Sequence, residues 1–146
     1  RLLIADEPTT AVDVTIQAQV LDLIKSLHRN RSMALMLITH DLGVIAESVE
    51  RVVVMYLGKV VENALVDDLF YKPYHPYTKG LLASIPNFQG REHHISPIEG
   101  AVPSLYERPQ GCPFHNRCPS FMKGICDEQE PTSFIIDENH EVSCHL

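Results

Sequence analysis

Short apolar runs alternate with a helical periodicity along the first 62 residues. The runs Leu2–Ala5 and Met33–Ile38 are uninterrupted, which is typical of strands covered on both faces in a parallel sheet. Between the two runs, apolar residues recur at helical spacing, at Ile16, Val20, Leu23, Ile24 and Leu27. This order of elements predicts an α/β fold with a largely parallel sheet and helices.

Acidic and hydroxyl side chains predict where the first two helices begin. Asp13 or Thr15 can cap the helix between the two apolar runs, because either side chain can accept a hydrogen bond from a free backbone N–H. Asp41 can cap a second, short helix that runs to about Glu47.

Two β-branched runs follow these helices. Arg51–Tyr56 and Lys59–Glu62 flank Leu57-Gly58, which predicts two antiparallel strands at the edge of the sheet, joined by a tight turn. Two more short helices are expected, one opening near Asp67 and one over Thr78–Ser84.

The second half of the chain has a different composition. From residue 73 onward it holds nine of the ten Pro, all four Cys and six of the eight His, and it has few periodic apolar positions. We therefore expect a first domain over residues 1–86 and an irregular, Cys-rich extension, held together by a ligand, over residues 87–146. Because Arg1 leads straight into an apolar strand, we also expect the chain to begin partway through a fold.

The composition excludes two classes of partner. Twelve Lys and Arg against nineteen Asp and Glu give a formal charge of −7, and no basic stripe could neutralise a phosphate backbone, so no nucleic acid partner is expected. No stretch of about 20 apolar residues could span a membrane, and no signal peptide pattern is present.

The first apolar run ends in two adjacent carboxylates, Asp6 and Glu7. In a parallel sheet this places them at the carboxyl edge, where α/β proteins bind ligands. Such a pair suits a magnesium nucleotide, with Asp6 holding Mg²⁺ and Glu7 orienting and deprotonating the water that attacks the γ-phosphate.

The residues around this pair resemble a known family of ATPases. LLIADEPTTAVD, over residues 2–13, is similar to the Walker B strand and D-loop of ABC-type ATPases, and LITHD, over residues 37–41, is similar to their switch segment. The resemblance implies a partial P-loop NTPase fold, with ATP and Mg²⁺ as cofactors. It also implies that Glu7 and His40 act in hydrolysis, and that Asp13 communicates across an ATPase dimer.

Two elements of that family are absent from the sequence. Neither the phosphate-binding loop G-x-x-x-x-G-K-[ST] nor an LSGGQ-like signature is present. Since that loop supplies the N–H groups and the lysine that bind phosphates, we do not expect this chain to hydrolyse ATP by itself.

The rest of the chain narrows the resemblance. HPYTKGLL over residues 75–82, GAVPSL over 100–105 and GCPFHNRCP over 111–119 resemble the oligopeptide/dipeptide (peptide/nickel) importer ATP-binding subunits. The resemblance implies a subunit at the cytoplasmic face of the cell membrane that energises import of di- or oligopeptides. Its implied partners are transmembrane permease subunits, a second ATPase subunit and, indirectly, an extracytoplasmic peptide-binding protein.

Three other functions compete with peptide import. A nickel or glutathione importer of the same group would share these motifs, and a non-transport metal-binding interaction module would use the ATPase part only as a scaffold. A soluble ABC ATPase of DNA repair or translation would share the first motif, but those proteins generally present a basic surface, whereas this chain is acidic.

Four cysteines with the spacing C-x₅-C-x₇-C-x₁₇-C form the candidate metal site, at Cys112, Cys118, Cys126 and Cys144. Structural zinc sites generally use closer C-x₂₋₄-C pairs, and wider gaps can enclose a bulkier cluster. The family resemblance implies a [4Fe–4S] cluster. Zinc remains an alternative, with His115, His140 or His145 able to replace a thiolate, as do free or paired thiols.

Overall fold

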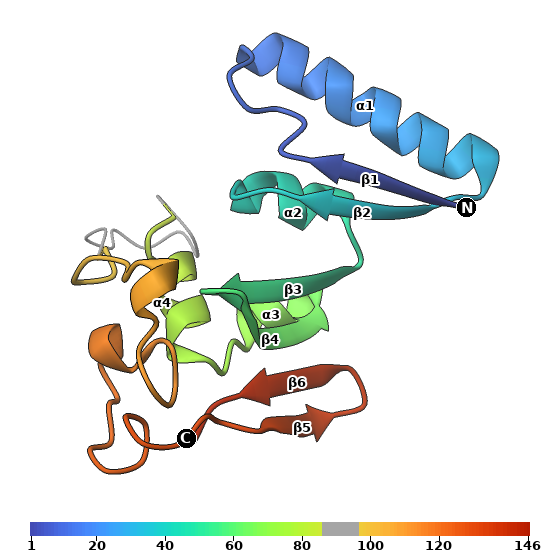
Figure 1. The fold of residues 1–146 in the computed structure, drawn as a ribbon. Helices are drawn as coiled ribbons and strands as arrows, with labels where there is room; N and C mark the ends of the chain where they lie inside the picture. The colour runs from blue at the N-terminus through green and yellow to red at the C-terminus, as the bar shows by residue number, and fades with distance from the viewer. Residues whose placement is uncertain (86–96) are drawn as a thin grey trace. The chain divides into compact units, whose positions relative to one another are not determined.

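The computed structural model describes residues 1–85 and 97–146, which form two compact units, residues 1–50 and 51–146 (Figure 1). The domain boundary predicted between residues 86 and 87 lies outside the described residues and stays a prediction. Each unit is described by itself.

The first unit has a two-stranded parallel sheet. Its strands are β1 (Leu2–Asp6) and β2 (Ala34–Ile38), and they are connected by the long helix α1 (Val14–Arg31). The short helix α2 (Leu42–Ser48) follows the second strand. The predicted order of strand, helix, strand and short helix is confirmed.

Both predicted caps are present in this unit. The Asp13 carboxylate accepts a hydrogen bond from the backbone N–H of Ile16 at 2.9 Å, which starts α1. The Asp41 carboxylate accepts from the backbone N–H groups of Gly43 and Val44 at 2.9 and 3.3 Å, which starts α2. These bonds satisfy N–H groups that have no partner inside the helix.

One face of the parallel sheet is exposed. Alternate residues of the two strands have exposed fractions of 45 to 57%, namely Leu2, Ile4, Met36 and Ile38. Val44 is the one fully buried residue of this unit. The prediction that both strands are covered on both faces is therefore wrong for this chain, because an apolar run reveals a strand but not which segments cover it.

The second unit is built on an antiparallel sheet of four strands in the order β3-β4-β6-β5 (Figure 1). They are β3 (Arg51–Tyr56), β4 (Lys59–Leu65), β5 (Ser133–Asp137) and β6 (His140–Ser143). The predicted tight turn between β3 and β4 is confirmed, with φ of 45° and 76° at Leu57-Gly58, as such hairpin turns require.

Two predictions about these strands are wrong. β3 and β4 do not extend the parallel sheet; β4 pairs with β6 of the tail instead, so the tail beyond residue 87 is not wholly irregular. The pairs Glu62–Val142 and Asn63–Glu141 join segments about 80 residues apart in the chain. Strands as short as β6 gain their stability from such a partner, which no local pattern reveals.

Two helices, α3 (Val66–Tyr71) and α4 (Pro76–Ala83), follow β4 in the chain, and the Cys-rich segment, residues 111–126, comes later. The helix predicted from Thr78 begins two residues earlier, because Pro76 suits the first turn and the His75 ring caps it. Among the described residues, no helix has the length and apolar character needed to cross a membrane.

An aromatic cluster joins the sheet, α4 and the Cys-rich segment. The ring centroids of Tyr56, Tyr77 and Phe114 lie 4.8 to 5.3 Å apart, and Phe114 is 1% exposed. Edge-on and tilted pairs at this distance are favourable beyond the area that they bury, so they fix the start of the Cys-rich segment on the sheet.

Candidate functional site

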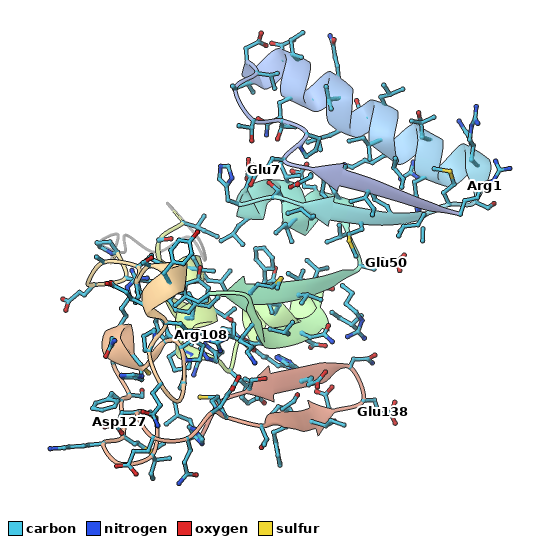
Figure 2. The ribbon with its side chains drawn as sticks, in the orientation of Figure 1. Arg1, Glu7, Glu50, Arg108, Asp127 and Glu138 are labelled. Carbon is cyan, nitrogen blue, oxygen red and sulfur yellow. The ribbon has the colours of Figure 1, made fainter. Side chains whose placement is uncertain are left out.

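Glu7 stands directly after β1, at the carboxyl edge of the parallel sheet (Figure 2). Its backbone N–H donates to the carbonyl oxygen of Ile38 on β2 at 2.8 Å. Its φ is 47°, a left-handed conformation that is uncommon for residues other than glycine. A strained backbone at such a place is typical of sites that must aim a side chain.

Both oxygens of the Glu7 carboxylate have hydrogen-bond donors. The Nδ1 of His40, which follows β2, lies 2.8 Å from Oε1, and the hydroxyl of Thr10 donates to Oε2 at 2.7 Å. The side chains of Glu7 and His40 are 39% and 79% exposed, so the pair lies open to solvent. The geometry therefore offers an oriented carboxylate next to an imidazole that a ligand can reach.

These contacts set the charge of the pair. The hydrogen bonds from Thr10 and then from His40 lower the pKa of Glu7 below its ordinary value. The hydrogen bond and charge of Glu7, in turn, raise the pKa of His40. Near neutral pH the carboxylate is therefore ionised and able to accept a proton or a hydrogen bond.

Asp6 and Asp13 are the other two residues of this unit that were predicted to belong to the site, and only Asp6 lies beside Glu7. Asp6 is exposed at the end of β1, next to Glu7 and opposite Ile38 in the register of the sheet. Asp13 lies beyond a turn, where its carboxylate caps α1. Glu7 and His40 thus form the contact, Asp6 lies beside it, and Asp13 has a helix-capping role.

Sequence reasoning missed two residues at this site. Thr10 holds the second oxygen of Glu7, and its position three residues later in a turn is a usable signal for such a bond. Gln17 on α1 donates from Nε2 to the Asp41 carboxylate at 3.3 Å, which links the two helix starts, and no local pattern indicates this contact.

The four cysteines lie in the second unit and are free thiols. Cys112 and Cys126 are buried, Cys118 and Cys144 are half-buried, and the backbone N–H of Cys112 donates to the carbonyl of Cys126 at 2.8 Å. Burial is the main cause that raises the pKa of Cys112 to about 11; a hydrogen bond with the backbone of Phe114 opposes the rise, and the nearby thiols Cys144, Cys126 and Cys118 contribute to it. The other three thiols therefore lie near enough to Cys112 to affect its ionisation.

The geometry also tests the histidines considered as metal ligands. His140 is 2% exposed and its Nε2 lies 2.7 Å from the carboxylate of Glu62, so this ring nitrogen is engaged by Glu62, and the replacement of a thiolate by His140 stays a prediction. His115 and His145 each contact a backbone carbonyl, of Cys112 and Gln129, at 2.9 and 3.0 Å. Among the residues that the structure describes, no group of three or more Cys, His, Asp or Glu could hold a metal ion.

Several bacterial proteins are similar to this chain over nearly all of its length. It is 50% identical over 145 residues to the dipeptide transport ATP-binding protein DppD of Bacillus subtilis (strain 168), which covers 99% of this chain and 43% of that protein. It is 52% identical over 146 residues to the oligopeptide transport ATP-binding protein AppD of the same strain, covering 100% of this chain and 44% of that protein.

A third relative is more distant. The chain is 43% identical over 145 residues to the dipeptide transport ATP-binding protein DppD of Escherichia coli (strain K12), covering 99% of this chain and 44% of that protein. The chain thus spans less than half the length of the relatives that it matches.

Residues 61–126 match the family model described as the oligopeptide/dipeptide transporter C-terminal region. The chain is therefore similar to the ATP-binding proteins of oligopeptide and dipeptide transport. The match to the family model begins in β4, includes α3 and α4, and ends at Cys126. It therefore covers Tyr77 and Phe114 of the aromatic cluster and three of the four thiols.

Proposed function

We propose that this chain is the C-terminal part of the ATP-hydrolysing subunit of an ABC transporter that imports di- or oligopeptides. The contact between Glu7 and His40 at the carboxyl edge of the parallel sheet carries the proposal. It is supported by the similarity to the dipeptide and oligopeptide transport ATP-binding proteins, and ATP with Mg²⁺ is the substrate that such proteins take.

Each side chain of the edge has a chemical role in this proposal. Asp6 is an exposed oxygen donor of the kind that Mg²⁺ prefers, and Glu7 is held ionised so that it can orient and deprotonate the attacking water. His40 positions the Glu7 carboxylate through Nδ1 and leaves its other ring nitrogen free to reach a γ-phosphate. Asp13 would act across an ATPase dimer at the start of α1.

The chain needs the rest of a longer protein for this activity. It has neither a phosphate-binding loop nor a signature segment, and its relatives are more than twice as long. We expect other segments of the longer protein to pack on the exposed apolar face of β1 and β2, because burial of apolar area from water is stabilising.

The proposed setting is the cytoplasmic face of a membrane. There the subunit would pair with a second ATPase subunit and dock on transmembrane permease subunits, which an extracytoplasmic peptide-binding protein would load. The roles proposed above for Asp6, Glu7 and His40 concern ATP and Mg²⁺ and not the transported molecule. Transport assays with labelled peptides, Ni²⁺ and glutathione therefore decide the substrate.

Glu7→Gln tests the catalytic role in the full-length gene product that contains this chain. Because the amide keeps the shape but loses the base, ATP binding should persist while turnover falls about 100-fold or more. Steady-state phosphate release and equilibrium nucleotide binding measure the two effects.

A matched control is Glu47→Gln, which removes an exposed carboxylate of α2 that no step uses. This control should hydrolyse ATP at the unmodified rate. If the Glu7→Gln protein turned over ATP as fast as the control, Glu7 would have no role as a base.

We also propose that Cys112, Cys118, Cys126 and Cys144 hold a [4Fe–4S] cluster with a structural role. The donor set fits, because four free thiols gather in a segment with little apolar core. The spacing of the four cysteines, which is wider than the C-x₂₋₄-C pairs of structural zinc sites, favours the larger cluster. The metal would keep the thiols ionised despite their burial.

Anaerobic purification of the 146-residue chain tests the metal. The expected result is iron and acid-labile sulfide in near-equal amounts, both lost on Cys126→Ser because one of four ligands is removed. Iron, zinc and sulfide assays on the same sample provide the measurement. Stoichiometric zinc without iron would contradict the [4Fe–4S] cluster and support a zinc site.

A further inference from the structure

A fully buried carboxylate holds the C-terminal hairpin, formed by β5 and β6, on strand β4. Glu62 of β4 is 0% exposed, and its Oε1 lies 2.7 Å from Nε2 of His140, the first residue of β6. The same carboxylate accepts the backbone N–H groups of Tyr74 and His75 at 2.7 and 3.1 Å. One side chain therefore joins the hairpin, β4 and the start of α4.

A second charged side chain, from the neighbouring strand, holds the residue before His140. Arg51 of β3 donates from Nη1 to the carbonyl of Asn139 at 3.1 Å and from Nη2 to its side-chain oxygen at 3.0 Å. Arg51 also donates to Asn63 of β4 at 3.2 Å, which fixes its position. Arg51 and Glu62, on adjacent strands, thus bind two consecutive residues of the hairpin, Asn139 and His140.

The strand ladder between β4 and the hairpin is short. β4 and β6 pair at only two positions, Glu62 with Val142 and Asn63 with Glu141, between the two other strands of the sheet (Figure 1). A buried carboxylate that loses one partner is left uncompensated, which is costly. Docking of the hairpin therefore draws on Glu62 and Arg51 in addition to the buried Val142.

The hairpin carries one of the four thiols. Cys112 and Cys126 are joined by a backbone hydrogen bond within the loop before β5, whereas Cys144 follows the end of β6. Cys112 and Ser143, the neighbour of Cys144, line one small cavity, so the end of β6 reaches the loop. Cys144 can join the other thiols only when β6 is docked.

We propose that Arg51 and Glu62 form a clamp that positions Cys144 as the fourth ligand of the metal site. This inference rests on the proposed [4Fe–4S] site. Arg51 and Glu62 are positioning residues and do not contact the metal. They act through Asn139 and His140 at the opposite end of β6 from the thiol.

Thiol reactivity in the metal-free 146-residue chain tests the clamp. Glu62→Gln keeps the shape of the buried side chain but removes its charge, so the hairpin should open more often and Cys144 should react with iodoacetamide about tenfold faster. Mass spectrometry follows each cysteine separately, and Cys118 serves as the reference because it is also half-buried. The Cys118 rate should stay within about twofold.

Two further variants separate positioning from loss of the fold. Arg51→Gln changes an exposed side chain and should raise the ratio of Cys144 to Cys118 rates by a few fold, because one half of the clamp remains. Glu62→Asp restores the charge and should return part of the protection. Glu138→Gln, at the turn of the same hairpin, is the control and should match the unmodified chain (Figure 2).

The possible results distinguish failure of the clamp from failure of the metal site. If Cys144 and Cys118 both reacted faster by the same factor in Glu62→Gln, or if the ratio of their rates did not change, the clamp would be refuted. If the ratio rose as expected but the unmodified chain bound no iron under anaerobic reconstitution with iron and sulfide, the metal site alone would fall. When both hold, Glu62→Gln should retain about half or less of the iron of Glu138→Gln.

Discussion

His75 shows how one buried side chain ties stability to pH. The ring is 1% exposed, Nδ1 accepts the backbone N–H of Tyr77 at 3.0 Å, and no described group pairs with Nε2. Burial lowers the pKa of His75 to about 4, against a smaller opposing effect of the Glu62 carboxylate, while Lys79 adds to the lowering. The ring is therefore neutral in the folded protein at pH 7.

This depressed pKa predicts acid sensitivity. Between pH 6.5 and 4 the unfolded chain binds a proton at His75 that the folded chain does not, so the free energy of unfolding falls as the pH falls. The loss from pH 7 to pH 5 should be about 2 kcal/mol. His75→Asn, which keeps a capping side chain, should lack this part of the loss. Urea unfolding at both pH values measures it, and an unchanged difference in the variant would contradict it.

Among the elements, the loop that carries the first three thiols depends on a glycine. Gly111 has φ of 71°, and a Cβ there would lie 2.5 Å from the carbonyl oxygen of Cys126, which is the acceptor for the Cys112 N–H. Gly124 in the same loop has φ of 80°, but a Cβ there would meet no atom within 4 Å. The two glycines share a left-handed backbone conformation and differ in the space available for a Cβ.

Alanine at Gly111 and alanine at Gly124 should therefore lower the free energy of unfolding by different amounts. Gly124→Ala should lower the free energy of unfolding by about 1 to 2 kcal/mol, the cost of a left-handed non-glycine residue. Gly111→Ala should cost at least about twice as much, because backbone atoms must also move and the bond between Cys112 and Cys126 is lost. Urea unfolding of both variants gives the comparison, and equal costs would show that the loop adapts freely.

Across the whole molecule, the two units differ in how much they bury. In residues 51–146 the sheet, α3, α4 and the Cys-rich segment enclose buried residues such as Val61, Leu69, Phe114 and Val142. In residues 1–50 a single residue, Val44, is fully buried and the sheet has two strands. A two-stranded sheet with an open apolar face is marginal in water.

Separate expression of the two units should therefore give different results. Residues 51–146 should fold alone and unfold cooperatively in urea, because their core is internal. Residues 1–50 should show little protection from amide exchange, because they have almost no core. Circular dichroism and hydrogen exchange provide the measurements. A stable, cooperatively unfolding fragment 1–50 would contradict this view of the fold.

The sequence by itself determined the local features. Apolar runs and helical spacing gave the order of β1, α1, β2 and α2, the carboxylates of Asp13 and Asp41 located both helix starts, and Leu57-Gly58 located the hairpin turn. Each of these is settled within a few residues by backbone geometry and capping bonds. The adjacent acids at the end of the first strand and the histidine after the second were also recognisable, because parallel strands end at one edge.

Only the tertiary structure decided which distant segments meet. The pairing of β4 with β6, the burial of Glu62 against His140 and the approach of Cys144 to Cys112 join residues far apart in the chain. Such contacts gain their free energy from burial and from shared hydrogen bonds, which no local pattern records. The bond from Thr10 to Glu7 depends in the same way on a turn that puts the Glu7 backbone in a left-handed conformation.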